Sequence, residues 1–305
     1  MYIWTNVLGS FVFDQQFKIV DKVLFSPADV NKKEATDATL RKKYQVKEPG
    51  PEQIKKILQQ LKHNSNFASF RANNIALTRI AIRNSVNNDN LIIQTVNSIG
   101  EIDKAANMII KRLREWYELY LPEFSHSILN HEKFVELVLK RSKKELMDEI
   151  KVKDSMGADI DTNPLMVLAK QTESLFVLRK KQEEYLEKLM MESCPNLTAI
   201  AGSVIGAKLL EKCGSLKRLA EFPASTVQLL GAEKALFRHM KTGARPPRFG
   251  YLHEHPIISR VKEKDKGKVA RTLADKISLA ARVDLFKGDR NFGIKCRKEI
   301  EEKFK

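Results

Sequence analysis

The feature that most constrains the fold of this 305-residue chain is a heptad run between residues 92 and 120. Spacings of three and four residues alternate without a slip over four heptads, through Ile92, Thr95, Ile99, Ile102, Ala106, Ile109, Leu113, Trp116 and Tyr120. Charged residues such as Lys104 and Glu115 lie between them. Because a helix brings residues at these spacings onto one side, the run predicts a long helix with an apolar stripe, and Pro122 closes it.

A second, looser series stops before Pro195, and its spacings are 7, 3, 4, 3 and 4: Leu168, Leu175, Leu178, Gln182, Tyr185 and Leu189. Two helices of about 30 residues, each about 45 Å long, would be separated by a shorter helical insert. We therefore expect a long antiparallel coiled-coil hairpin over residues 89–193. Such a hairpin buries both stripes on itself, but it is thin, and its exposed remainder invites a second copy.

The first 88 residues predict a small α/β domain. Apolar residues alternate from Ile3 to Phe25, which indicates two or three short antiparallel strands. A helix is expected from Pro27 to Lys43, and another begins near Pro51 with Ile54, Leu58 and Leu61 on one face. The asparagine-rich segment 84–90 marks the end of this domain.

Residues 194–290 predict a compact, all-helical domain, and residues 291–305 a short polar tail, so the whole chain is expected to be α+β. Gly202, Gly206 and Gly214 suit close helix contacts or helix ends. Gly202 and Gly206 do not indicate a phosphate loop, because the third glycine, the preceding strand and the GK[ST] ending are missing.

Composition narrows the classes of partner. The net charge is +16 and 43% of the residues are hydrophobic, which excludes general disorder and favours a polyanionic partner, nucleic acid before a membrane surface. No apolar run reaches the roughly 20 residues that span a bilayer, and the N-terminus lacks the pattern of a signal peptide, so we expect an intracellular protein. Three widely spaced cysteines without a CxxC indicate neither a zinc site nor disulfides.

The positive charge is concentrated between Gly231 and Asp284, a segment that contains thirteen Lys/Arg and six Asp/Glu. A helix near 231–241 places three cations on one face and apolar side chains on another: Lys234, Arg238 and Lys241, against Leu236, Phe237 and Met240. A helix over 266–284 repeats this arrangement: Lys268, Arg271 and Arg282, against Val269, Leu273, Ile277 and Ala280. Two basic faces joined by a loop with Arg245 and Arg248 suit a phosphate backbone, while ordinary solvated faces remain the alternative.

Catalytic signals are missing from the sequence. No Ser/His/Asp or Cys/His nucleophile arrangement is present, and no glycine-rich loop could hold S-adenosylmethionine or a nucleotide, so we expect neither an enzyme nor a cofactor. His253 and His255 form an H-x-H without a nearby third ligand, which disfavours a metal site. Because their loop lies in the basic segment, a contact of one histidine with an RNA base or phosphate is an alternative.

Three segments carry a family resemblance: PNLTAIAGSVIGAKLL (195–210), LAEFPASTVQLLGAEKALFRHMKTG (219–243) and KGKVARTLADKISLAARVD (266–284). They closely resemble the Nop domain of box C/D ribonucleoprotein scaffold proteins, and the similarity extends from about Asn90 to Asp284. The resemblance implies a non-catalytic RNA-binding scaffold in rRNA processing and RNA methylation. It would position the methyltransferase fibrillarin for 2′-O-ribose methylation on a box C/D guide RNA that already carries a small L7-type kink-turn protein.

The resemblance also implies roles for parts of this chain. Residues 1–88 would bind fibrillarin, and residues 194–290, as the Nop domain, would bind RNA with its protein. The family dimerises through the hairpin, which implies a homodimer contact along Ile99, Ile102, Ile109, Leu113, Trp116 and Tyr120. The chain lacks the lysine-rich extension of eukaryotic members, which points to the archaeal form and a cytoplasmic location, or a nucleolar one in a eukaryote.

The motif GAEKALFR matches residue for residue, so the contact with RNA and its bound protein is carried onto Glu233, Lys234 and Arg238. A carboxylate can accept hydrogen bonds from bases, and an ammonium can contact phosphate. Lys241, Arg245 and Arg248 are assigned from charge and a looser match. Lys268 and Arg271 belong to a matching motif, where they contact RNA or support the fold.

Two other functions compete with this one. The first is an RNA-modifying enzyme, against which the missing cofactor loop argues. The second is a helical coiled-coil nucleic-acid-binding protein unrelated to RNA modification, such as a parallel dimer on duplex DNA. The sequence does not specify the guide RNAs, the particle stoichiometry or the residues that contact fibrillarin.

Overall fold

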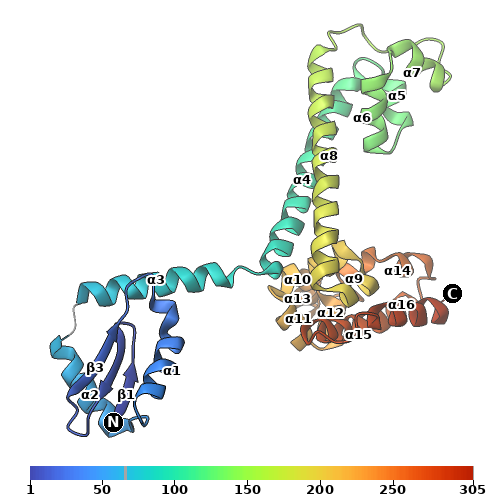
Figure 1. Cartoon of the computed structure of the whole chain (residues 1–305). Coiled ribbons are helices and arrows are strands. Elements are labelled where there is room, and N and C mark those ends of the chain that lie inside the picture. The colour runs from blue at the N-terminus through green and yellow to red at the C-terminus, as the bar shows by residue number, and fades with distance from the viewer. Residues whose placement is uncertain (65–66, 305) are drawn as a thin grey trace. The chain divides into compact units, whose positions relative to one another are not determined.

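The computed structural model describes residues 1–64 and 67–304 and divides into two compact units, Met1–Asn87 and Asn88–Lys305 (Figure 1). The N-terminal unit contains a three-stranded antiparallel sheet in the order β1-β2-β3, formed by Tyr2–Thr5, Gly9–Phe13 and Ile19–Leu24. In the C-terminal unit, all regular elements formed by the described residues are helices. The α+β prediction is therefore confirmed.

Both faces of the small sheet are covered by helices. Phe11 and Phe13 pack against Ile57 of α2 (Pro51–Asn64) on one face. On the other face, Ile3 and Val12, which are paired in the register of β1 and β2, pack against Leu40 of α1 (Lys33–Lys43). This two-sided burial follows from the alternation of side chains along each strand.

A third helix of the N-terminal unit, α3 (Phe67–Ser85), follows α2, and a short 3₁₀ helix, η1 (Val30–Lys32), precedes α1. The amide of Asn73 is buried and donates to the carbonyl oxygens of Val7 and Phe25, both at 2.9 Å. These bonds fix one side of α3 to the loops around the sheet and leave other side chains of α3 exposed.

The C-terminal unit is built on an antiparallel hairpin of two 31-residue helices, α4 (Asn88–Glu118) and α8 (Asn163–Ser193) (Figure 1). At its base, the Asn88 amide donates to Ser193 Oγ at 2.8 Å. Further along, the Arg179 guanidinium lies 3.1 Å from a carboxylate oxygen of Asp103 and also pairs with Glu132 of the insert. The predicted pair of long helices is confirmed, including their length.

The phase of the apolar stripe on α4 agrees with the prediction only in part. Ile92, Ile99, Ala106 and Leu113 are buried at every seventh position, as expected. Thr95 is buried as predicted, but Val96, Ile110 and Tyr117 are buried too, whereas Trp116 is 41% exposed and Ile102 and Ile109 are half-buried. Packing against the insert explains why Tyr117 rather than Trp116 is buried, because the centre of the Tyr117 ring lies 5.8 Å from that of Phe124 and 5.5 Å from that of Phe134.

The stripe on α8 shows the same kind of change in phase. Leu189 is buried as predicted, and Leu168, Leu175 and Gln182 are half-buried. Leu178 and Tyr185 are exposed, contrary to the prediction, and the fully buried residues are Leu165, Ala169, Thr172, Leu186 and Met190. The hairpin therefore leaves apolar side chains of both helices on its surface.

The insert between the two long helices forms three short helices at the far end of the hairpin, α5 (Pro122–Ser127), α6 (His131–Lys140) and α7 (Lys143–Glu149) (Figure 1). Arg114 of α4 holds the insert by donating to the carbonyl oxygens of Ser125 and Ile128, both at 2.7 Å. Its guanidinium also lies 4.3 Å from the centre of the Phe134 ring. The insert is thus part of the same hydrophobic core as the outer half of the hairpin.

The base of the hairpin merges with the C-terminal helices into one core. The central helix is α15 (Lys266–Leu285), and around it pack α9 (Pro195–Ala201), α11 (Leu216–Glu221), α12 (Ala224–Leu229), α14 (Pro256–Arg260) and the 3₁₀ helix η2 (Tyr251–Glu254). Helix α10 (Ser203–Cys213) packs mainly on α4 and α8. A Cβ on Gly206 would lie 2.8 Å from the end of the Met190 side chain, which confirms that this glycine serves helix packing.

The prediction of a polar tail after residue 290 is wrong. Phe292–Lys303 form α16, and its Cys296 and Ile300 are buried in the main core. Asn196 of α9 connects α16 to α15. The Asn196 side-chain oxygen accepts a hydrogen bond from the Gly293 N–H at 2.7 Å, and the Asn196 backbone N–H donates to the Asp284 carboxylate at 3.1 Å. The spacing of Phe292, Cys296, Ile300 and Phe304 is a helical signal that the polar composition of the segment obscures.

All three cysteines are buried as free thiols. Burial raises the pKa of Cys194 to about 12 and that of Cys213 to about 11, and it also raises the pKa of Cys296. Within the described residues, none of the helices combines the length and the apolar character that crossing a membrane requires.

Candidate nucleic-acid interface

The basic segment begins at a tight turn that leads into α13 (Glu233–Thr242). Gly231 adopts a φ of +90°, and a Cβ at this position would lie 2.8 Å from the ring of Tyr251. The Gly231 N–H donates to Glu233 Oε1 at 2.7 Å. One oxygen of the Glu233 carboxylate therefore stabilises the turn, and the other is left for a contact outside the chain.

The loop after α13 is tied back to the start of the segment. Gly243 ends the helix at a φ of +67°, in the left-handed region that glycine tolerates. Gly250 then passes so close to Leu230 that a Cβ would lie 1.8 Å from the Leu230 carbonyl oxygen. The Gln228 side chain donates to the Arg248 carbonyl oxygen at 2.6 Å, so loop 243–250 is held in a defined position.

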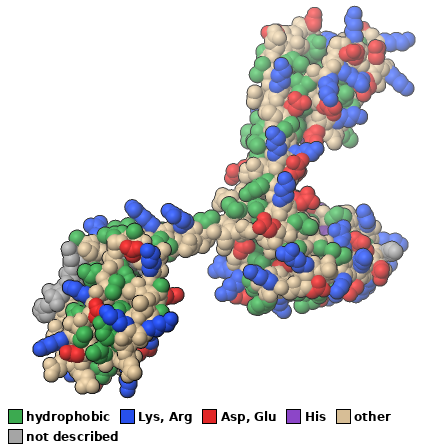
Figure 2. Space-filling view, in the orientation of Figure 1, with side chains coloured by type: hydrophobic (Ala, Val, Ile, Leu, Met, Phe, Trp, Pro, Cys, Tyr) green, Lys and Arg blue, Asp and Glu red, His purple; other side chains and the backbone are tan. Residues whose placement is uncertain are grey.

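Four of the predicted RNA-binding cations, Lys234, Arg238, Lys241 and Arg245, lie on α13 and the loop that follows it, where none of them is buried. None of them makes an ion pair with any residue in the ranges 1–64 and 67–304. Figure 2 shows Lys and Arg side chains over the visible face of the C-terminal helices, with Asp and Glu between them. Cations without a carboxylate partner are free to bind an external anion.

Arg248 connects the loop to the turn before α15. Its guanidinium lies 3.3 Å from Glu263 Oε1, and Glu263 also pairs with Lys266 at 2.8 Å. The hydrogen bond from Lys266 is the main reason that the pKa of Glu263 is lowered. Arg248 thus has a structural contact in addition to its exposed position.

Lys268 and Arg271 lie on the exposed side of α15, opposite its buried face. Lys268 is 3.8 Å from the Asp265 carboxylate, a weak contact. Three further exposed cations at the same turn, Arg260, Lys262 and Lys264, were missed at the level of the sequence. The charge run RVKEKDK is the signal that could have identified them.

The apolar side of α13 is not covered. Phe237 is 58% exposed and Met240 is 62% exposed, and no residue of this helix is buried. An amphipathic helix with both faces in solvent presents an apolar surface directly beside a basic one. Such a pair of surfaces fits a partner that offers protein and phosphate side by side.

The two histidines of the H-x-H differ. His255 is buried, its Nδ1 accepts from the Ile257 N–H at 3.3 Å, and its Nε2 faces the Ile200 carbonyl oxygen at 2.9 Å. Burial lowers its pKa, and an RNA contact by His255 is excluded. His253 is exposed and stacks on Phe249 at 5.7 Å. Among the residues described, no group of three or more potential metal ligands occurs.

The hairpin residues predicted to dimerise fall into two groups. Ile99 and Leu113 are buried inside the hairpin, and Tyr120 lies half-buried under the Lys143 ammonium at 4.4 Å. Ile102, Ile109 and Trp116 lie at the exposed edge of α4. Further exposed apolar side chains accompany them on and beside both long helices: Met108, Leu119, Val167, Val177, Leu178 and Tyr185. A surface contact can involve only the second group.

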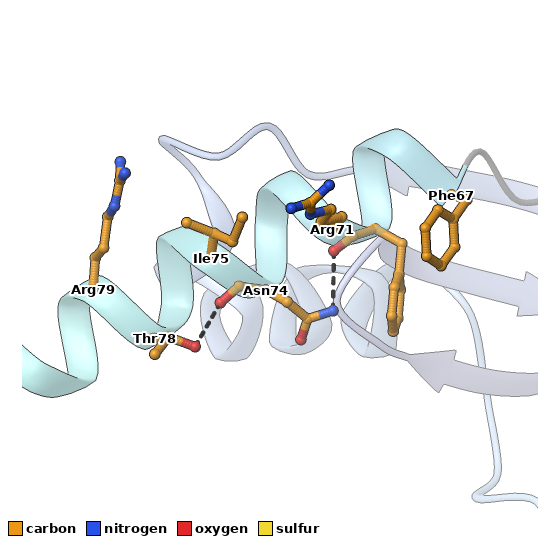
Figure 3. Close-up of a pocket in the computed structure, with 7 residues that line it drawn as sticks. Phe67, Arg71, Asn74, Ile75, Thr78 and Arg79 are labelled. Carbon is orange, nitrogen blue, oxygen red and sulfur yellow. Dashed lines mark hydrogen bonds between the residues drawn. The ribbon is translucent and has the colours of Figure 1, made fainter.

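The N-terminal unit has an exposed apolar groove along α3 (Figure 3). Phe67, Phe70 and Ile75 provide its apolar wall, and Arg71 and Arg79 are its cations. The Asn74 amide donates to the Phe70 carbonyl oxygen at 3.0 Å, within the same helix. All of its lining residues belong to α3, so the groove is an open surface of one helix rather than an enclosed pocket.

Comparison with known proteins gives one family match. A family model described as "Nop: snoRNA binding domain, fibrillarin" matches residues 98–305. An uncharacterised NOP5 family protein of Methanocaldococcus jannaschii is 37% identical over 75% of this chain and 61% of its own length. Nucleolar protein 56 of Dictyostelium discoideum is 39% identical over 71% of this chain and 45% of that protein.

Nucleolar protein 56 of Saccharomyces cerevisiae is 34% identical over 75% of this chain and 51% of that protein. The chain thus spans about half to three fifths of the length of these relatives. Among solved structures, a chain from the crystal structure of a fibrillarin/Nop5p complex shares 22% identity. The match covers 98% of this chain and 99% of that chain, with a TM-score of 0.46.

Proposed function

Because the chain belongs to the Nop family, we propose that it is a non-catalytic scaffold of a box C/D guide-RNA ribonucleoprotein. In this role it positions fibrillarin for 2′-O-ribose methylation of a target RNA. The description of the family, a snoRNA-binding domain with fibrillarin, supports both the RNA and the protein partner. The NOP5 family relative belongs to an archaeon, which supports a cytoplasmic location, whereas eukaryotic relatives carry a nucleolar name.

The observation that carries the proposal is the double exposure of α13. Its cations lack carboxylate partners within the described chain, and its Phe237 and Met240 lack apolar cover. A bare RNA would use only the first surface, and a bare protein would use mainly the second. The helix is therefore suited to a kink-turn RNA that already carries its L7-type protein.

Individual roles on this surface follow from position and charge. Lys234, Arg238 and Lys241 bind phosphates, and the free oxygen of Glu233 accepts a hydrogen bond from a base or from the bound protein. Arg245 and Arg248 extend the basic surface along loop 243–250, and Lys268 and Arg271 extend it onto α15. Phe237 and Met240 pack on the L7-type protein.

The other two elements hold protein partners. The groove along α3, with Phe67, Phe70 and Ile75, binds fibrillarin, because an exposed apolar row of this kind suits a protein surface better than RNA. The exposed edge of α4 with Ile109 and Trp116, together with Leu178 and Tyr185 of α8, forms the homodimer contact. The scaffold then carries one fibrillarin and one RNA–protein site per subunit.

An electrophoretic shift assay with the full chain tests the proposal. The wild type should bind bare kink-turn RNA weakly and bind the same RNA much more tightly once the L7-type protein is on it. Lys234→Ala with Arg238→Ala should weaken the second complex by ten-fold or more, about 1.4 kcal/mol. The slope of log affinity against log salt should become shallower by about two, because two phosphates are no longer neutralised.

A matched control removes two cations elsewhere. Lys180→Ala with Lys188→Ala changes the net charge equally, on exposed positions of α8. This variant should retain the affinity and the salt slope. If the two double variants behave alike, or if the L7-type protein does not raise the affinity of the wild type, α13 is not the binding surface.

A further inference from the structure

The C-terminal end of α15 carries an exposed aromatic side chain among cations. Phe286, the residue after this helix, is 79% exposed. Arg282 Nε donates to the Ala220 carbonyl oxygen at 3.0 Å, so α11 lies along the last turns of α15. We define the Phe286 patch as Phe286 together with five exposed cations of α11, of the last turn of α15 and of the turn that follows: Lys217, Arg218, Arg282, Lys287 and Arg290.

The carboxylates of this segment do not neutralise the patch, because only Glu221, exposed at the end of α11 and without an ion pair among the described residues, is available against its five cations. Asp284 is buried and accepts from the backbone N–H groups of Asn196 and Leu197 at 3.1 and 2.8 Å. Asp289 pairs with Lys295 at 3.0 Å. In contrast, Lys217, Arg218, Lys287 and Arg290 have no ion-pair partner in the part of the chain that the structure describes. The patch is therefore a cationic surface around one aromatic ring.

Lys287 has a backbone conformation that favours glycine, which indicates that its lysine side chain has a function. Lys287 adopts a φ of +53°, and the Gly288 N–H donates to the Val283 carbonyl oxygen at 2.8 Å, as at the left-handed end of many helices. Glycine is the residue that occupies this conformation without strain. The chain instead places lysine there, one residue before a glycine and directly after Phe286 in the sequence.

We propose that the Phe286 patch is a second RNA-binding site, specific for single-stranded RNA. A base stacks on the Phe286 ring, and the adjoining phosphates bind Lys287, Arg290 and the cations of α11. A protein partner fits less well, because it would gain one ring of apolar contact while desolvating several unpaired cations. Stacking on an isolated aromatic surrounded by cations is the arrangement by which proteins hold unpaired nucleotides.

This site is distinct from the surface on α13. The 20 residues of α15 separate Lys266, which shares a carboxylate with Arg248 of the α13 loop, from the patch by about 30 Å. If its bases stay stacked at the duplex spacing of about 3.4 Å, a single strand covers that distance with about nine nucleotides. The inference rests on the proposed function, because the strand that reaches the patch is the continuation of the RNA held at α13.

The test compares two RNAs, each bound by the L7-type protein, with the full chain. One is the kink-turn alone, and the other adds a single-stranded uridine extension of about 15 nucleotides, longer than the span between the sites. The extension should raise the affinity of the wild type by about ten-fold. Phe286→Leu should abolish that gain, because leucine keeps apolar bulk without an aromatic face, and Phe286→Trp should retain it.

Lys287→Gly separates binding from folding. It relieves the left-handed strain and should raise the melting temperature, yet it should reduce the gain from the extension several-fold. Ile294→Ala, at an exposed apolar position on α16, is the matched control and should change neither quantity. If Lys287→Gly binds the extended RNA as tightly as the wild type does, Lys287 does not contribute to the RNA-binding site.

The two RNAs also distinguish the failure of this inference from the failure of the proposed function. If the wild type binds neither RNA–protein complex, the function of the α13 surface is wrong. If it binds both complexes equally, or if Phe286→Leu retains the gain, only the Phe286 patch is overturned. A loss that is equal on both RNAs in Phe286→Leu would indicate a protein contact or a folding role, and it would overturn the patch as well.

Discussion

The helices α13 and α15 look alike in sequence and differ completely in their surroundings. Both place cations on one face and apolar residues on another. On α15 the apolar face is buried among α9, α11 and α12, with Val269, Leu273 and Ile277 fully inaccessible to solvent. On α13 no residue is buried. An amphipathic pattern thus predicts a helix reliably, but it does not say whether the covering surface belongs to the same chain.

The difference also shows what stabilises each helix. α15 is held by the hydrophobic core, which dominates the free energy of folding. At the ends of α13, the Gly231–Glu233 hydrogen bond fixes the turn before the helix, and the N–H of the left-handed Gly243 donates to the His239 carbonyl oxygen. Leu236 is half-buried, whereas Phe237 and Met240 remain in solvent and contribute little to the stability of the fold, as is expected of side chains on a binding surface.

The sharpest test of this contrast replaces one apolar residue of α15 with a charge. Ile277→Asp should unfold the C-terminal unit or lower its free energy of unfolding by about 4 kcal/mol or more, because it buries an unpaired carboxylate. Phe237→Asp on α13 is the matched change and should leave the unfolding transition nearly unchanged. Urea denaturation followed by circular dichroism measures both. Similar losses in the two variants would contradict the contrast.

The hairpin presents covered and uncovered apolar residues on a single helix, which allows a second test. Trp116→Asp should abolish the proposed homodimer and leave the helix content intact, since the Trp116 ring lies at the exposed edge of α4. Leu113→Ala, in contrast, should keep the dimer and lower the unfolding free energy by about 2–5 kcal/mol. Multi-angle light scattering reports the mass of each variant. A dimeric Trp116→Asp protein would place the contact elsewhere.

A smaller effect concerns pH and the buried histidine beside α14. Burial lowers the pKa of His255 below 6.5, so the folded state favours the neutral ring while the unfolded state takes up a proton. The stability that the neutral ring contributes is complete above about pH 6.5 and is lost as the pH falls towards the folded pKa. Denaturation midpoints between pH 7 and 5 should fall less in His255→Asn, whose side-chain oxygen can still cap Ile257. If the midpoint falls equally steeply with pH in the wild type and in His255→Asn, protonation of His255 does not contribute to the loss of stability.

The smallest effect is expected where nothing is buried. Phe237→Ala with Met240→Ala should change the free energy of unfolding by less than about 0.5 kcal/mol, as for exposed positions in general. The same variant should lose most of the gain in RNA affinity that we propose the L7-type protein provides, while its affinity for bare RNA stays the same. A stability loss above about 1 kcal/mol would show that α13 packs on its own chain.

Sequence patterns are accurate guides where one pattern dominates and fail where two patterns compete. The two long helices, the small sheet and the buried face of α15 all follow from periodicity. Beside each heptad position such as Leu113, however, the sequence offers two apolar candidates, Trp116 and Tyr117, and only the insert that packs around Tyr117 decides between them. That information lies in residues distant in the chain.

The candidate site shows the same limits. The cations of α13 are recognisable because they are unusually dense in sequence, and their accessibility agrees with that assignment. The exposure of Phe237 could not be derived, since an apolar face is normally covered. The burial of His255 depends on the carbonyl group of Ile200, 55 residues away. Helix α16 was missed because its few apolar residues lie among many charges, although their spacing of four was visible.

The burial of all three thiols has a practical consequence for measuring this molecule. The thiolate is the nucleophile that attacks maleimide and spin-label reagents, and a raised pKa lowers the thiolate fraction of Cys194, Cys213 and Cys296. Their burial also keeps the reagent away from the sulfur. A single cysteine introduced at an exposed position such as Arg245 or Arg290 should therefore react alone in the otherwise native sequence. Two fluorescent labels attached at such positions would allow energy transfer to measure the distance between them and its change when RNA binds.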